Sequence, residues 1–216
     1  MNDRSINSRL LKAEVAISNS RSHEEVKEQL AVFGYDDTML MQGYNLYNEA
    51  ARKQESKVKE YAEQYEATNQ LDKAKADAHK VYMKYLKVAR VAFTDHVKFS
   101  ETLMLNGRRK LSYTGWLEQA EMFYSQALSN NEILAGLAKF GITKNKLKQG
   151  EALVTEVRNN LKTQLTEKAE AQEATQNRDI AFDVMEKWLG DFTEIARIAL
   201  DENSQYLEML GIIEPS

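Results

Sequence analysis

The sequence predicts an all-α protein made of two similar halves. Three observations support this prediction. The chain aligns with itself when shifted by about 107 residues, which is the signature of an internal repeat. It contains 1 Pro and 9 Gly in 216 residues, so long stretches hold no helix breaker. Apolar residues recur at helical spacing, and no segment alternates in the manner of a strand.

The internal repeat covers nearly the whole chain with few gaps. The segment Leu30–Gly34, for example, aligns with Leu137–Gly141 and shares four of its types, Leu, Ala, Phe and Gly. We therefore expect a first helical repeat at residues 1–107 and a second at 108–216, packed together as one pseudo-two-fold unit.

Each repeat opens with a helix of moderate length, expected at about 5–19 and 114–128. A polar break follows in both halves. Ser22 and Ser129 each stand three residues before a glutamate, the spacing of a capping box. We therefore expect these two serines to cap the next helix through their hydroxyl groups.

That next helix is short and is expected to end at a glycine in both repeats. Gly34 and Gly141 directly follow a helical run, and each precedes an apolar residue, Tyr35 or Ile142. Glycine adopts the left-handed conformation of a helix C-cap at little cost, and an apolar residue commonly follows it. Both glycines are therefore predicted structural caps.

The longest element of each repeat has two possible structures. No Gly or Pro lies between Gly43 and Gly107, or between Gly150 and Gly190. Such a segment forms either one continuous helix or a hairpin of two helices of about 30 residues each. The apolar pattern is regular at both ends but thins around residues 66–73.

A polar middle between two amphipathic flanks is typical of a hairpin tip, so the sequence favours the hairpin. Thr68 and its aligned residue Thr175 stand where the turns are expected. The predicted fold is therefore two long antiparallel helical hairpins that form a four-helix-bundle-like core, with the shorter helices flanking it.

Gly43 and Gly150 lie inside the helical pattern and are present in both halves. A glycine within a helix costs up to about 1 kcal/mol relative to alanine. Retention of both predicts that another helix packs closely on each of them.

Composition excludes several classes of function. The net charge is −4, without the basic excess that phosphate backbones require, so no nucleic-acid partner is expected. No apolar run reaches the roughly 18–20 residues of a membrane span. The first residues lack the apolar core of a signal peptide, and a cytoplasmic location is expected.

No recognisable catalytic or metal-binding pattern is present. The chain has no Cys, and none of His23, His79 and His96 follows a glutamate at the spacing of a di-iron site. The second repeat has no His, which excludes a symmetric histidine site. We therefore expect neither a metal nor a cofactor, and whether the chain is an enzyme stays open, with the balance against it.

Two arginines are the best candidates for a polar site. Arg90 and Arg197 align with each other and lie within apolar stretches, where an unpaired charge is costly. Glu49 and Glu156, also aligned, are the expected partners on the neighbouring helix. The pairs are either structural ion pairs that fix helix register or the walls of a pocket for a polar ligand.

Tyr61 and Tyr65 have no tyrosine at the aligned positions and lie near the expected tip of the first hairpin. Exposed tyrosine is common at protein contacts. The two residues are the best candidates for an interaction surface, and ordinary packing against a neighbouring helix is the alternative.

The sequence favours a non-catalytic helical scaffold or adaptor that associates with a protein partner or with itself. The alternative is a binding protein or enzyme that holds a small polar ligand in a cleft lined by the Arg/Glu pairs. A concave pocket that contains Arg90 or Arg197 with an unsatisfied polar group would favour the alternative, and a solid core there would end it.

Overall fold

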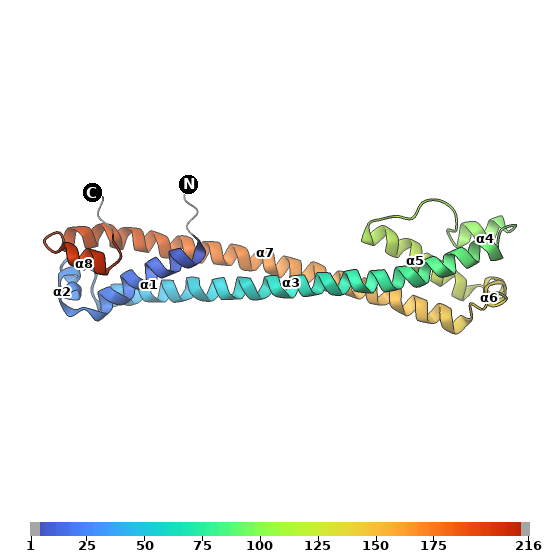
Figure 1. The fold of residues 1–216 in the computed structure, drawn as a ribbon, viewed down its shortest axis with the longest axis horizontal. Helices are drawn as coiled ribbons and strands as arrows, with labels where there is room; N and C mark the ends of the chain where they lie inside the picture. Colours follow the sequence, from blue (N-terminus) through green and yellow to red (C-terminus); the bar gives the residue numbers. More distant parts are fainter. Residues whose placement is uncertain (1–4, 213–216) are drawn as a thin grey trace. The chain divides into compact units, whose positions relative to one another are not determined.

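The computed structural model describes residues 5–212, and this part of the chain is helical without any strand (Figure 1). Its helices are α1 (Ile6–Ser22), α2 (Glu24–Val32), α3 (Asp37–Ala92), α4 (Val97–Thr102), α5 (Tyr113–Ser129), α6 (Asn131–Ala138), α7 (Lys144–Ala199) and α8 (Ser204–Met209). The all-α prediction is confirmed for these residues.

The chain divides into two compact units. Within the described residues, unit 1 comprises 5–60 and 170–212, and unit 2 comprises 61–169. Unit 1 therefore contains both ends of the described chain, whereas unit 2 is a single continuous segment. Each unit takes residues from both of the predicted repeats.

Unit 1 is a bundle built around one apolar core. Its parts of α3 and α7 run in opposite directions, and α1, α2 and α8 pack with them (Figure 1). The largest fully buried side chains of this core include Phe182, Phe192, Ile17, Leu30 and Leu40.

Unit 2 repeats this arrangement with the remaining helices. Its parts of α3 and α7 pack with α4, α5 and α6 around a second core. The largest fully buried side chains here include Trp116, Tyr82, Tyr124, Phe123 and Leu86. The edge-to-face contacts of Tyr82 with Trp116 and Phe123 place aromatic rings at the centre of this core.

The predicted hairpins are wrong, because α3 and α7 are each one continuous helix of 56 residues. No turn occurs at Thr68, whose hydroxyl donates a hydrogen bond to the Gln64 carbonyl one turn earlier at 2.9 Å. Thr175 does the same to Ala171 at 3.0 Å. A four-helix core made of two hairpins is therefore not formed.

Buried alanine residues explain why the apolar pattern thins in the middle of α3. Ala67, Leu71, Ala74 and Ala78 are all buried and recur at spacings of four and three residues. This stripe is apolar and continuous but carries little bulk, and it is flanked by charged residues. No helix in the described residues is long and apolar enough to cross a membrane.

Ser22 and Ser129 do not cap the following helices, so that prediction is wrong. Ser22 is the last residue of α1, and its hydroxyl donates to the Ser18 carbonyl at 2.8 Å. Ser129 likewise ends α5. The N-cap of α6 is Asn130, whose side-chain oxygen accepts from two backbone N–H groups. The helix boundary lies one residue later than the capping-box spacing implies.

The short helices α2 and α6 end at glycines with positive φ, +88° at Gly34 and +75° at Gly141. The N–H of Tyr35 donates to the Leu30 carbonyl, and the N–H of Ile142 donates to the Leu137 carbonyl, both at 3.1 Å. These bonds satisfy carbonyl groups that a helix end leaves free, in the pattern of a Schellman motif.

The helix bounds recur 107 positions along the chain. α3 and α7 span Asp37–Ala92 and Lys144–Ala199, and α1 and α5 are offset by the same amount. α4 and α8 also keep this offset, whereas α6 ends one residue short of it. We call the residue 107 positions away in the other half of the chain the counterpart of a given residue.

Candidate functional site, a cavity in unit 1

Unit 1 contains a cavity of about 690 Å³ between α1 and the C-terminal part of α7. This volume lies within the range of small-molecule sites. The lining residues come from α1, from α7 and from the segment after α8: Ser8, Arg9, Leu11, Lys12, Val15, Glu186, Leu189, Gly190, Thr193, Glu194, Arg197, Gly211 and Ile212.

One wall of the cavity carries a two-point ion pair between α1 and α7. Arg9 donates from Nε to Glu186 Oε1 at 2.5 Å and from Nη2 to Glu186 Oε2 at 2.7 Å. The guanidinium carbon also lies 4.8 Å from the centre of the Phe182 ring. Hydrogen bonding to Glu186 raises the pKa of Arg9, so the guanidinium stays charged.

Arg197 is less completely paired. Its Nη1 donates to Glu194 Oε1 at 2.7 Å, one turn earlier on α7. Its Nε is buried and has no hydrogen-bond partner. A buried donor without an acceptor costs about 1–3 kcal/mol, and Arg197 is one of the residues that line the cavity.

The lining combines positive charge with apolar surface. Arg9, Lys12 and Arg197 supply three cations, whereas Glu186 and Glu194 supply two anions that are already paired with arginines. Leu11, Val15, Leu189 and Ile212 supply the apolar part of the lining. A wall with an excess cation beside aliphatic side chains suits a ligand that has an acidic group on an apolar body.

Gly190 keeps the cavity open on the α7 side. A Cβ atom added to this residue would meet nothing within 4 Å. Its counterpart in unit 2 is Met83, which is half-buried and packs against the apolar core. The two positions therefore differ in whether a side chain fills the space beside the helix.

Two further counterparts of lining residues are bulky and buried. Trp116 stands in place of Arg9 and is 2% exposed, and Tyr82 stands in place of Leu189 and is fully buried. The Trp116 indole N–H donates to Nδ1 of His79, the counterpart of Glu186, at 2.9 Å. At these positions unit 2 fills with its own side chains the space that unit 1 leaves open.

Arg90, the counterpart of Arg197, has the acceptor that Arg197 lacks. Its Nε donates to the Leu105 carbonyl at 2.8 Å. Leu105 is the counterpart of Ile212, which lines the unit 1 cavity. The Nε atom therefore has a hydrogen-bond acceptor in Arg90 of unit 2 and none in Arg197 of unit 1.

The stability of unit 2 should depend on pH through His79, which accepts the Trp116 indole N–H. Burial, with a smaller contribution from Lys75, lowers the pKa of His79. The unfolded state therefore binds more protons between the folded pKa and the ordinary value of about 6.5. We expect the free energy of unfolding to fall as the pH drops from about 6.5 through this window.

His79→Gln should make this acid dependence shallower, because an amide oxygen still accepts the indole N–H and does not titrate. Urea denaturation followed by far-UV circular dichroism, at several pH values on both sides of the histidine pKa, measures the difference. The acid dependence that the two proteins share through all their other groups serves as the internal control. Parallel pH profiles for the two proteins would contradict the expectation.

The expected pairing of the arginines with Glu49 and Glu156 is not found in the described residues. Glu49 pairs with Arg52 and Lys53 on its own helix, and Glu156 is exposed. Arg197 pairs with Glu194 instead. An acid three residues away on the same helix reaches the guanidinium more easily than an acid on a neighbouring helix.

Both internal glycines lie under an aromatic ring. A Cβ atom on Gly43 would come within 3.0 Å of three atoms of the Trp188 ring, and one on Gly150 would come equally close to Tyr124. Both glycines are buried. Each ring also has a buried polar atom without a partner, the Trp188 Nε1 and the Tyr124 hydroxyl.

Tyr61 and Tyr65 lie within α3 rather than at a hairpin tip. Tyr65 is 67% exposed, whereas Tyr61 is half-buried and has an interaction with a neighbour. Only part of the expected surface is therefore open to solvent.

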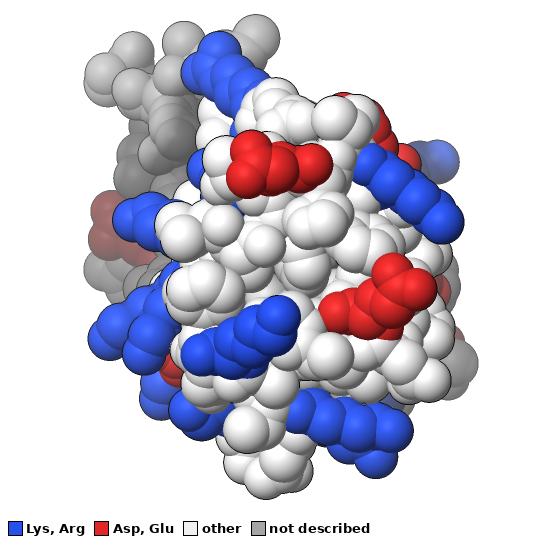
Figure 2. Space-filling model, turned by 90° about the vertical axis from the view of Figure 1, so that its right-hand side faces the viewer, with Lys and Arg blue, Asp and Glu red and all other residues white. Residues whose placement is uncertain are grey.

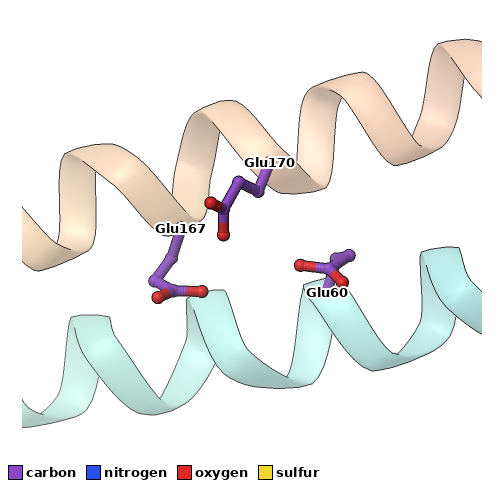
Figure 3. A group of neighbouring side chains, drawn as sticks. All are labelled: Glu60, Glu167 and Glu170. Carbon is purple, nitrogen blue, oxygen red and sulfur yellow. The ribbon is translucent and has the colours of Figure 1, made fainter.

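Acidic side chains gather on α3 and α7. Within unit 1, carboxylate oxygens of Glu60 and Glu170 lie within 4.8 Å of each other, and Glu167 precedes Glu170 by one turn of α7 (Figure 3). Glu60 also lies 3.8 Å from the Lys59 ammonium. Glu170 is exposed to water, and exposed carboxylates commonly gather in this way without a cation. The cluster does not by itself make a metal site.

Sequence reasoning found Arg197 but missed Arg9, Glu186 and Gly190. Residues that agree between the two halves mark shared packing, and these three differ from their counterparts. A difference between counterparts was therefore the useful signal. Arg9 and Glu186 carry charges where unit 2 has Trp116 and His79, and Gly190 has no side chain where unit 2 has Met83.

Comparisons with protein-family models, with curated proteins and with solved structures found no match to this chain.

Proposed function

We propose that this chain is a binding protein that holds one small anionic molecule in the cavity of unit 1. The single observation that carries the proposal is that Arg197, which lines the cavity of about 690 Å³, has a buried Nε donor without an acceptor. Native proteins seldom leave a buried donor unpaired, and an oxygen of the bound molecule would complete it.

The proposed role is binding without covalent chemistry. The charged groups of the cavity are three cations and two carboxylates, and both carboxylates are held by arginines. The arrangement suits recognition of an acid better than acid–base catalysis.

Native mass spectrometry on protein purified from its own source tests this function. The wild-type chain should carry one small molecule per copy. Arg197→Gln, expressed in the same cells, should come mostly as the bare chain because it lacks the charged donor. Bare wild-type protein, together with no rise in melting temperature across a panel of small anions, would refute the proposal.

We further propose that the two halves arose by tandem duplication and that one copy kept the cavity while the other filled it. The common offset of 107 positions between helix bounds supports this history. The similar segments at the ends of the short helices, Leu30–Gly34 and Leu137–Gly141, support it as well.

A second candidate function is association with a protein partner. A second copy of this chain is the first partner to test. The face of unit 2 shown in Figure 2 supports it, because a largely uncharged area there is bordered by Lys and Arg with Asp and Glu among them. In unit 2, Val97 of α4 is 76% exposed, and Phe140 after α6 is 51% exposed. Exposed apolar surface within a polar rim marks interaction sites.

The same native mass spectrum separates the two candidates. A mass of two chains that persists on dilution supports association, and a single chain carrying a small molecule supports the cavity. A bare single chain at every concentration, together with no rise in melting temperature across the anion panel, would refute both.

A further inference from the structure

We propose that the molecule bound in unit 1 is an aromatic carboxylate, with its acid group on Arg197 and its ring against Leu189 and Val15. This inference rests on the proposed function and specifies its ligand. It follows from the chemistry of the guanidinium edge and from what occupies the counterpart positions of unit 2.

The acid group is assigned from the guanidinium geometry. The Nε and Nη2 atoms of an arginine form one edge that matches the two oxygens of a carboxylate. Arg9 uses this edge to hold both oxygens of Glu186 in the same cavity. The Nη1 of Arg197 is taken by Glu194, and its Nε has no partner, so the matching edge of Arg197 is the one left to a ligand.

The aromatic ring of the proposed ligand is inferred from the side chains at the counterpart positions of unit 2. There Tyr82 and Trp116 stand in place of Leu189 and Arg9, with ring centres 6.2 Å apart in an edge-to-face contact. The Tyr82 hydroxyl accepts a hydrogen bond from Arg109 Nη1 at 3.0 Å. The same arrangement of helices thus encloses an aromatic ring whose oxygen meets a guanidinium.

Unit 1 has room for such a ring because its own side chains are smaller. Leu189 lacks the phenol of Tyr82, and Gly190 lacks the whole side chain of Met83. Val15 and Leu11 add aliphatic surface from α1. We therefore place the ring of the ligand beside these aliphatic side chains.

Phenylacetate is the probe that tests this ligand class. Its neutral amide, phenylacetamide, removes the charge, acetate removes the ring, and hexanoate replaces the ring by an alkyl chain. Binding is read by saturation-transfer NMR on the ligand and by the fluorescence of Trp188 in a Trp116→Phe background. Trp188 lies in unit 1 next to the lining residue Leu189, and Trp116→Phe removes the other tryptophan of the chain.

Phenylacetate should bind at least about tenfold more tightly than phenylacetamide or acetate, as expected for one charge-assisted hydrogen-bonded contact. Arg197→Lys should lose at least about tenfold, because an ammonium does not offer the two-donor edge. Gly190→Met, which introduces the side chain found at the counterpart, should abolish binding. Arg90→Lys is the matched control in unit 2 and should bind as the parent protein does.

The outcomes distinguish this inference from the proposed function. If hexanoate or inorganic phosphate binds at Arg197 as tightly as phenylacetate, the cavity binds anions but the aromatic assignment is wrong. If phenylacetate binding survives in Gly190→Met, the ring does not enter this cavity and the assignment fails. If no probe binds and native mass spectrometry finds a bare chain, the proposed function itself fails.

Discussion

Replacing Gly43 by alanine should destabilise unit 1 by about 1–3 kcal/mol, although alanine is the better helix former. The added methyl group would enter the space of the Trp188 ring, with three ring atoms within 3.0 Å. The ring has little freedom to move, since it stacks on Phe192 at a centroid distance of 5.2 Å and meets the edge of Tyr35. Close packing therefore outweighs helix propensity at this position.

The same substitution at Gly190 is the matched control. Gly190 lies in the same unit and also within a helix, but an added Cβ meets nothing within 4 Å. Gly190→Ala should therefore stabilise unit 1 by about 0.5–1 kcal/mol. Urea denaturation followed by Trp188 fluorescence in the Trp116→Phe background measures both changes in the unit that contains them. Effects of the same sign at the two positions would show that Trp188 does not constrain Gly43.

Trp116→Ala should destabilise unit 2 by about 3–5 kcal/mol, the range for removing a buried tryptophan. The indole is 2% exposed, packs edge-on against Tyr82 and donates its N–H to His79. Truncation removes the contact, leaves a void and deprives His79 Nδ1 of its donor. Each of these losses acts in the same direction.

Trp116→Phe is the control, because it keeps an aromatic ring and removes the hydrogen bond and part of the volume. It should cost clearly less than the alanine variant. Far-UV circular dichroism during chemical denaturation reports the loss in both variants, and Trp188 fluorescence reports separately on unit 1. If Trp116→Ala costs less than about 1 kcal/mol, the indole does not fill the core as described.

Helix content was predictable because it depends on local chemistry. The scarcity of Pro and Gly and the helical spacing of apolar residues act within each segment. Whether a long segment folds back depends instead on what its middle packs against. Around Thr68 the middle of the helix is buried through alanine side chains. Because alanine has a small apolar area, the sequence pattern there does not stand out as a buried face.

The candidate site was only partly predictable, for a different reason. Arg197 was recognisable because a charge within an apolar stretch needs a partner. The identity of that partner could not be read from the sequence, since Glu194 on the same helix competes with acids on neighbouring helices. The cavity depends on missing volume at Gly190, and a single sequence does not indicate which missing side chain leaves space open.

The division of the chain into an uninterrupted unit 2 and a unit 1 drawn from both ends has a consequence for biosynthesis. During translation, all residues of unit 2 have been made once position 169 is reached, whereas the early residues of unit 1 must await those from 170 onward. The α1 and α2 segments thus leave the ribosome long before α7 and α8, which complete their core, have been made. Their apolar faces stay only partly covered during this interval.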